Sequence, residues 1–458
     1  MTHRPHPAAV VATTHGPVRG EHQPYGTRFL GIPYAAPPVG ALRFAEPRPP
    51  TPWVEPLDAT AYGPTAQRRG FVEEPGIPEP SIPGDGILNL NVFTPAADAS
   101  AALPVLVWIH GGGYVAGSAA SPWYDGAAFC RDGVVLVSIG YRLGIEGFLH
   151  LDDAPDNRGV RDWIAALEWV RDNIAAFGGD PAKVTVAGQS AGGGAVQTLL
   201  AVPAARGLFR GALALSGAMM HPQDRWAGHA VADLFTRRTG VPATAAALRD
   251  RSDQELLALQ DAVTAPGPDR ADLPGLLLAP FADGDLLPRP ALTELTDPTE
   301  HTELTEGGTA ADVPLLLGFT RHEFHAAGGP ELTDRVFRRP NLALAEALTA
   351  RDCPVWLYEF HWPSPVPGAI EGLAFHCLDL PFAFDLLDAE GVTAAAGHAP
   401  PQALADAMHG AYTAFVRDLD PGEDWPRYTP ERRAVRIWDA QPQVADDPLR
   451  ELRADLSD

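Results

Sequence analysis

The hydrophobic pattern of the chain is dominated by short apolar runs that alternate with amphipathic stretches. Residues 103–109 and 134–139 are almost continuously apolar, as expected for strands buried on both faces of a sheet. Further runs of this kind occupy residues 183–187, 212–215, 313–317 and 355–360. Residues 161–177 carry apolar side chains at helical spacing and end at two glycines, which indicates a helix. This alternation predicts an α/β fold with a central, mostly parallel sheet covered by helices on both faces.

Two regions depart from this alternation. Residues 11–53 mix short apolar runs with Gly-Pro turns, which predicts an N-terminal antiparallel hairpin followed by an irregular loop. Residues 221–273 are helix-like and contain no buried strand, so we interpret them as a helical excursion over the sheet, with mere surface decoration as the alternative. We expect residues 1–458 to form one domain.

Composition and charge limit the classes of molecule that the protein can bind and the compartment in which we expect it. The formal net charge of −24 would repel nucleic acid and anionic membranes over most of the surface. The apolar run at residues 8–12 is too short for a signal-peptide core or a membrane span, so we expect a cytoplasmic protein. The three cysteines, Cys130, Cys353 and Cys377, are too few and too scattered for a disulfide framework or a metal site. We therefore predict reduced structural thiols, no metal and no cofactor.

A Gly-x-Ser-x-Gly stretch follows the strand at residues 183–187. Its glycines allow the close backbone approach that a strained strand-to-helix turn requires, and the turn would present Ser190 as a nucleophile. An ordinary glycine-rich turn before a helix is the alternative, so the motif depends on its context.

A glycine loop, His110-Gly111-Gly112-Gly113-Tyr114, follows the strand at residues 103–109. Consecutive glycines let backbone N–H groups point into a pocket that side chains would block. Upstream of a nucleophile elbow, such a loop predicts an oxyanion hole that the N–H of Ala191 completes. A flexible glycine turn is the alternative interpretation.

Ordered motifs along nearly the whole chain resemble the type-B carboxylesterase and cholinesterase family of α/β-hydrolases. They are residues 31–40 (GIPYAAPPVG), 42–44 (LRF), 90–92 (LNV), 110–113 (HGGG), 141–144 (YRLG), 172–181 (DNIAAFGGDP), the elbow, 283–284 (DG), 287–288 (LP), 425–428 (WPRY) and 447–448 (DP). The resemblance implies the α/β-hydrolase fold, and it implies that Gly112 and Gly113 join Ala191 as oxyanion donors.

The remaining members of a triad should follow in the order serine, acid, histidine. Residues 318–323 resemble the family's segment that carries the catalytic acid, which implies Glu323. Asp283 and Asp285 are the rival acids, but turn chemistry explains their Asp-Gly context better.

The family's histidine loop is similar to residues 375–382, which implies that His376 is the general base. Glu323 would then orient its ring and stabilise the imidazolium. The rival histidines are His322, His325 and His361.

Further residues resemble supporting positions of the family. Ser216 resembles a serine that forms a hydrogen bond near the catalytic acid, and Arg142 with Asp162 resembles a buried structural ion pair. Tyr114, Phe324 and Phe375 lie close to catalytic positions in sequence, so they are candidates for an apolar substrate pocket or for plain core.

The chain departs at several positions from the pattern of the family that it resembles. Gln189 precedes the nucleophile where relatives commonly have Glu. No Trp lies between Trp53 and Trp108 to bind choline. Both differences argue against quaternary ammonium substrates. Ile87 replaces a cysteine of many relatives, and with it the expected disulfide. His376 follows Glu323 by only 53 positions, so we interpret residues 324–345 as a shortened lid and predict a wider pocket mouth.

These observations predict a serine carboxylic-ester hydrolase that acts through an acyl-enzyme on a small to medium or bulky apolar ester. An acyltransferase, amidase or lactonase acting on a natural-product scaffold would use the same triad and remains an alternative. A non-catalytic binding module related to cholinesterases fits less well, because such modules lack triad members. The expected partner is a small-molecule ester, and the expected state is a monomer or homodimer.

Overall fold

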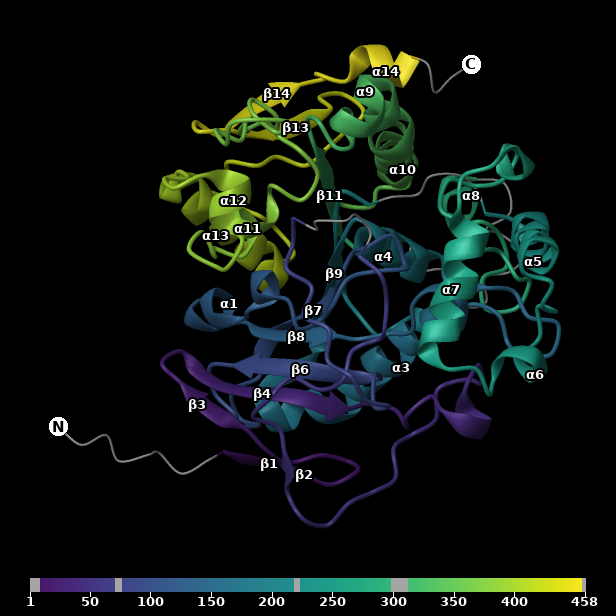
Figure 1. Cartoon of the computed structure of the whole chain (residues 1–458). Coiled ribbons are helices and arrows are strands. Elements are labelled where there is room, and N and C mark those ends of the chain that lie inside the picture. The colour runs from purple at the N-terminus through teal and green to yellow at the C-terminus, as the bar shows by residue number, and fades with distance from the viewer. Residues whose placement is uncertain (1–8, 71–75, 218–222, 298–311, 455–458) are drawn as a thin grey trace.

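A large mixed sheet forms the centre of the protein (Figure 1). The computed structural model describes residues 9–70, 76–217, 223–297 and 312–454. Within them the sheet has the strand order β14-β13-β12-β11-β10-β9-β7-β8-β6-β4-β3. Its strands are β3 (Glu21–Gln23), β4 (Gly26–Pro33), β6 (Asn89–Thr94), β7 (Leu103–Ile109), β8 (Val135–Ile139), β9 (Gly179–Gln189), β10 (Gly211–Leu215), β11 (Leu315–Thr320), β12 (Val355–Phe360), β13 (Ala434–Trp438) and β14 (Gln443–Asp446).

The direction of pairing changes across this sheet. All neighbours from β8 to β13 pair in parallel, whereas β3, β4, β6 and β14 add antiparallel pairs at the two ends. A separate small sheet holds the predicted N-terminal hairpin, β1 (Val10–Ala12) and β2 (Pro17–Arg19), with β5 (Leu57–Asp58) beside it. The predicted fold class is therefore confirmed.

Helices cover both faces of the large sheet, as Figure 1 shows. Those drawn on one side are α1 (Ala127–Arg131), α11 (Leu380–Ala383), α12 (Val392–Ala396) and α13 (Gln402–Asp418). Those on the other side include α3 (Arg158–Asn173), α4 (Ala191–Ala201), α5 (Arg225–Thr239), α6 (Ala245–Leu248), α7 (Asp253–Thr264), α8 (Ala291–Thr296) and α10 (Arg339–Thr349). The remaining helices are α2 (Gly144–Phe148), α9 (His325–Thr333) and α14 (Arg450–Ala454).

Alternate residues of β7 point into two separate hydrophobic cores. Val105, Val107 and Ile109 belong to the core under α3 and α4, and Leu106 and Trp108 belong to the core under α13. A strand whose two faces are both buried has no polar face, which explains the continuous apolar runs of the sequence.

The range interpreted as a helical excursion (221–273) and the range interpreted as a shortened lid (324–345) both form helices in the described residues. α5, α6 and α7 occupy most of the range 223–273. α9 is kinked at Gly328 and Gly329, and a short π-helix (Asp334–Arg338) joins it to α10. The single-domain organisation of the chain stays a prediction, and so does the wider mouth of the substrate pocket. No helix in the described parts of the chain has the length and apolar character needed to cross a bilayer.

A buried ion pair ties α3 to the segment that follows β8. Arg142 Nε and Nη2 donate to the two carboxylate oxygens of Asp162 over 2.8 and 2.7 Å, and the two side chains are 1% and 0% exposed. Arg142 Nη1 also donates to the carbonyl oxygen of Ala45. The pair therefore joins three distant segments of the chain.

Replacing Asp162 with asparagine is expected to lower the free energy of unfolding by about 3–5 kcal/mol, because the buried Arg142 guanidinium loses its counter-charge. Urea denaturation followed by circular dichroism measures this loss. The matched control is Asp418→Asn, since the Arg417–Asp418 pair is 57% and 54% exposed and such pairs are worth at most about 1 kcal/mol. Equal losses in the two variants would contradict the structural role of the buried pair.

Candidate active site

A sharp turn between β9 and α4 presents Ser190. β9 ends at Gln189, α4 begins at Ala191, and Ser190 between them has φ 59° and ψ −121°. Its flanking glycines leave no room for side chains: a Cβ on Gly188 would lie 2.4 Å from the backbone of Gly192. The turn therefore holds a serine in a strained conformation that positions its side chain above the sheet.

Three side chains from separate parts of the sequence form a hydrogen-bonded chain at this turn. His376 Nε2 lies 2.8 Å from Ser190 Oγ, and His376 Nδ1 is hydrogen-bonded to Glu323 Oε2. The other carboxylate oxygen of Glu323 accepts a hydrogen bond from the Thr320 N–H over 2.8 Å. Glu323 is only 2% exposed, so water does not compete for its oxygens.

The loops that carry the acid and the histidine are bonded directly to each other. His322 and Phe375 form a parallel bridge, and the His376 N–H donates to the Glu323 carbonyl oxygen over 3.2 Å. His322 Nδ1 accepts a hydrogen bond from the Ala374 N–H over 3.0 Å. We call these two hydrogen-bonded loops, residues 321–323 and 374–376, the acid–base unit.

The rival residues are engaged elsewhere. The ring of His322 supports the acid–base unit, and His361 Nε2 lies 2.9 Å from Glu359 Oε2. Asp283 Oδ1 accepts hydrogen bonds from the N–H groups of Asp285 and Leu287 in its own turn. No hydrogen bond connects any of them to Ser190 within the described residues.

The glycine loop lines the same cavity as Ser190. Gly112 and Gly113 have φ values of 110° and 60°, which favour glycine. A Cβ on Gly111 would lie 2.7 Å from the Gln189 carbonyl oxygen, so the glycine loop packs directly on the elbow. Ala191 supplies the first N–H of α4, which has no partner inside its helix. These donors could hold an oxyanion.

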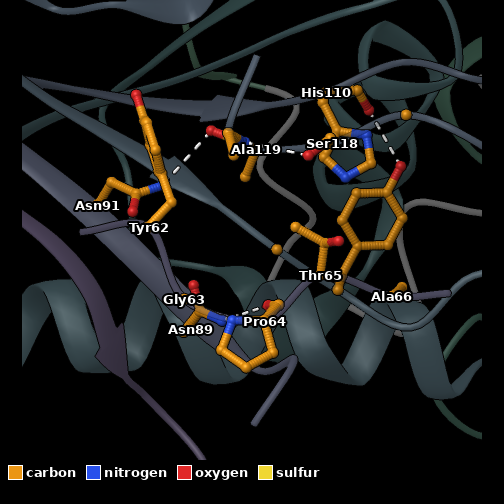
Figure 2. Close-up of a pocket in the computed structure, with 14 residues that line it drawn as sticks. Tyr62, Gly63, Pro64, Thr65, Ala66, Asn89, Asn91, His110, Ser118 and Ala119 are labelled. Carbon is orange, nitrogen blue, oxygen red and sulfur yellow. Dashed lines mark hydrogen bonds between the residues drawn. The ribbon is translucent and has the colours of Figure 1, made fainter. Parts of the chain in front are cut away.

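A second, smaller cavity adjoins His110, the first residue of the glycine loop (Figure 2). It has a volume of about 10 Å³, and His110 and Ser118 are on its wall. His110 Nδ1 is 2.8 Å from the Gly111 carbonyl oxygen, and Tyr141 Oη donates to the His110 carbonyl oxygen. Burial lowers the pKa of His110 to about 4. The imidazole is therefore neutral at physiological pH, and it supports the loop as a hydrogen-bond partner.

The main cavity, with a volume of about 280 Å³, opens onto Ser190 and His376. Its apolar and aromatic lining includes Ile77, Trp123, Tyr124, Phe324, Leu373 and Phe375. The expected pocket residues Phe324 and Phe375 lie on this wall, but Tyr114 does not. With φ 63°, Tyr114 turns into the core, where its ring packs 5.2 Å from Phe148 and 6.1 Å from Trp163.

The ring of His376 is held from several sides. The Phe324 and Phe337 rings pack against it with centroid distances of 4.5 and 5.2 Å. Burial by itself lowers the pKa of His376, but the neighbouring Cys377 and Glu323 raise it well above its usual value. The hydrogen bond to the Glu323 carboxylate favours the protonated ring.

Gln189 and Cys377 adjoin the same ring. Gln189 Nε2 lies 3.2 Å from His376 Nε2 and donates to Cys377 Sγ over 2.9 Å. Gln189 Oε1 is buried and has no hydrogen-bond partner in the described part of the chain. Cys130, Cys353 and Cys377 are all free thiols, but Cys377 lines the main cavity instead of serving only as structure.

Ser216 does not form the hydrogen bond expected for it. Its Oγ is buried without a partner among the described residues, while its N–H donates to the Gly318 carbonyl oxygen. Among the described residues the Glu323 oxygens instead accept hydrogen bonds from the Thr320 N–H and from His376 Nδ1.

Two acidic residues near the site are absent from the candidates that the sequence provides. Asp379 is fully buried and accepts a hydrogen bond from Tyr358 Oη over 2.8 Å. Burial and the charge of Glu323 raise its pKa to about 7. Its position three residues after His376 is a sequence signal that could have found it. Glu79 lines the main cavity and lies far from every motif, so no sequence signal marked it.

The described residues contain no group of three or more His, Cys, Asp or Glu side chains arranged to hold a metal ion.

Comparison with known proteins identifies the family of the chain. The model of the carboxylesterase family matches residues 7–328. The chain is 34% identical to the para-nitrobenzyl esterase of Bacillus subtilis (strain 168), over 100% of this chain and 99% of that protein. It is 32% identical to the phenmedipham hydrolase of Pseudarthrobacter oxydans, over 92% and 93% of the two chains. A solved thermophilic PNB esterase, 32% identical, superposes with a TM-score of 0.86 over 98% of this chain and 99% of that one.

Proposed function

The chain belongs to the carboxylesterase family and is a carboxylic ester hydrolase, and from this premise we propose that Ser190, His376 and Glu323 carry out the hydrolysis. The hydrogen-bonded chain from Ser190 Oγ through the imidazole to Glu323 is the observation that carries this proposal. It places a base within reach of the nucleophile and an acceptor within reach of the base.

In the first half of the reaction Ser190 Oγ attacks the ester carbonyl carbon, and its proton passes to His376 Nε2. Glu323 accepts the hydrogen bond from Nδ1–H and stabilises the imidazolium that forms. The tetrahedral intermediate then collapses, the alcohol leaves with the proton from Nε2, and the acyl group remains on Ser190.

In the second half a water molecule takes the place of the alcohol. His376 removes a proton from the water as it attacks the acyl carbon, and the imidazolium then returns the proton to Ser190 Oγ as the carboxylic acid leaves. In both halves the N–H groups of Gly112, Gly113 and Ala191 hold the oxyanion. Each such donor typically contributes about 10²–10³ in rate.

We infer that the substrate is a small to medium or bulky ester with a largely apolar body. The aromatic and aliphatic side chains on the wall of the main cavity support this inference. Cytoplasmic location is part of the same proposal, and the free thiols Cys130, Cys353 and Cys377 support it.

A fluorophosphonate that labels Ser190 tests the nucleophile and the base together. Labelling requires neutral His376, and because the pKa of His376 is raised, the rate should fall as the pH drops through a midpoint above about 6.5. The measurement is the labelling rate between about pH 5 and 10, with the modified peptide identified by mass spectrometry. An adduct elsewhere than on Ser190 would contradict the proposed nucleophile, and a midpoint at or below about 6.5 would contradict the raised pKa.

A further inference from the structure

One wall of the main cavity carries a carboxylate that the proposed reaction does not use. Glu79 lines the cavity together with Ser190 and His376, although most of the side chains around it are apolar or aromatic. Exposing a carboxylate to such a cavity is unfavourable whenever an apolar ligand removes its water. The position of Glu79 therefore raises the question of what it binds.

Glu79 is held firmly through one of its two oxygens. Glu79 Oε2 accepts a hydrogen bond from the Gly117 N–H over 3.0 Å and lies 3.3 Å from Arg68 Nε. Arg68 directs its other donors to the carbonyl oxygens of Glu79 and Pro80, over 2.9 and 3.0 Å, and to that of Ala66. These contacts fix both the side chain and the backbone of Glu79 beside the glycine loop.

The counter-charge lies behind the carboxylate. The Arg68 side chain is 4% exposed and is not part of the cavity wall, whereas that of Glu79 is 13% exposed and is part of it. A ligand in the cavity therefore meets the carboxylate first. Within the described residues Glu79 Oε1 forms no hydrogen bond, and an ionised carboxylate has acceptor sites to spare on each oxygen.

We propose that Glu79 is a specificity-determining residue that accepts a hydrogen bond from a protonated primary or secondary amine on the ester substrate. This inference rests on the proposed function, since it concerns the substrate of the same site. A charge-assisted hydrogen bond in a cavity with few competing waters is stronger than a neutral one. The enzyme would then favour amine-bearing esters over neutral esters of the same shape.

The chemistry of the site separates three kinds of ligand. A neutral isostere leaves Glu79 Oε1 without water and without a donor, and a site with an unpaired polar group rejects such analogues. A quaternary ammonium has no N–H to donate, so it cannot replace the lost hydrogen bond. The net charge of −24 also favours the approach of cationic substrates over anionic ones.

Two pairs of rigid esters test this inference. Piperidin-4-yl acetate and cyclohexyl acetate differ at the alcohol side, and ethyl piperidine-4-carboxylate and ethyl cyclohexanecarboxylate differ at the acyl side. The readout is the ratio of kcat/KM for the amine ester to that for its neutral isostere, measured where the amine is protonated. We expect a ratio of about 10 or more on one of the pairs, and a fall of about 10- to 100-fold in this ratio in Glu79→Gln. The N,N-dimethylpiperidinium analogue should lose most of the preference.

Control variants keep the result interpretable. Glu423→Gln removes an exposed negative charge elsewhere and should leave the ratio unchanged. Because Glu79→Gln leaves the buried Arg68 unpaired, the double variant Arg68→Gln/Glu79→Gln is measured as well. It should lose the same preference.

A ratio near one for both pairs in the wild type, or an unchanged ratio in both Glu79 variants, would overturn the inference. Phosphonate labelling of Ser190 in the wild type and in each variant separates this failure from failure of the proposed function. If Ser190 is labelled and neutral esters are hydrolysed without a preference for amine-bearing esters, the proposed function stands and the proposed role of Glu79 is overturned. Absence of any Ser190 adduct in the wild type would overturn both.

Discussion

Replacing Ser190 with alanine is expected to lower kcat for a neutral ester by about 10⁶-fold, because a serine nucleophile that acts as a unit with its base cannot be replaced by the remaining groups. The glycine loop and the cavity would remain, so hydrolysis should still exceed that in water by about 10³–10⁴-fold. A chromogenic ester with an apolar acyl group measures both quantities.

The matched control for this variant is Ser100→Ala, which removes an exposed hydroxyl far from the elbow and should leave kcat unchanged. Circular dichroism establishes that both variants fold. Retention of more than about a hundredth of the wild-type kcat in folded Ser190→Ala would show that another group is the nucleophile, since loss of the true nucleophile costs far more.

Replacing Glu323 with glutamine is expected to lower kcat by about 10⁴-fold through the wrong histidine tautomer. The Thr320 N–H donates to Glu323 Oε1 over 2.8 Å, so the oxygen of a glutamine would be kept on that side. Its NH₂ group would then face His376 Nδ1 and donate to it. The imidazole proton would move to Nε2, which is the atom that has to accept the proton of Ser190 Oγ.

The variant Glu323→Asp separates this tautomer effect from a loss of packing. Aspartate keeps two acceptor oxygens but withdraws them from the ring, and misplacement by about 1 Å costs about 10²-fold. We therefore expect steady-state kinetics to rank the activities as wild type, then Glu323→Asp, then Glu323→Gln. Equal losses in the two variants would contradict the tautomer argument.

The buried strands and the elbow could be predicted because their signals are local in the sequence. The predicted range 103–109 coincides with β7, and 355–360 coincides with β12, since strands buried on both faces need unbroken apolar runs. Strands β13 and β14 at the sheet edge were not predicted. β14 is exposed or only partly buried, so it lacks the apolar run that marks a central strand.

Side-chain directions were predicted less well than positions along the chain. Tyr114 follows the glycine loop directly, yet its positive φ turns the ring into the core. Ser216 also has a positive φ, 48°, and its hydroxyl makes none of the expected contacts among the described residues. A sequence pattern gives the order of residues at a site, but backbone conformation decides which of them face the cavity.

Contacts between distant segments were beyond the reach of sequence reasoning. Glu79 reaches the site because Arg68 and Gly117 hold it there, and none of these three residues belongs to a periodic pattern. Cys377 was interpreted as a structural thiol, but the fold places its sulfur against Gln189 beside the cavity. Each of these placements depends on tertiary packing, which no local signal encodes.

The acid–base unit has a consequence for how this fold can diversify. Hydrogen bonds between residues 321–323 and 374–376 fix the relative position of the two loops that carry the carboxylate and the imidazole. An insertion or deletion at residues 328–331, which are exposed or half-buried, then changes mainly the closure entropy of a surface segment, which grows slowly with loop length, whereas Phe324 and Phe337 have to stay against His376. The covering of the cavity can therefore be remodelled by evolution or by design while the proton-transfer geometry is inherited unchanged.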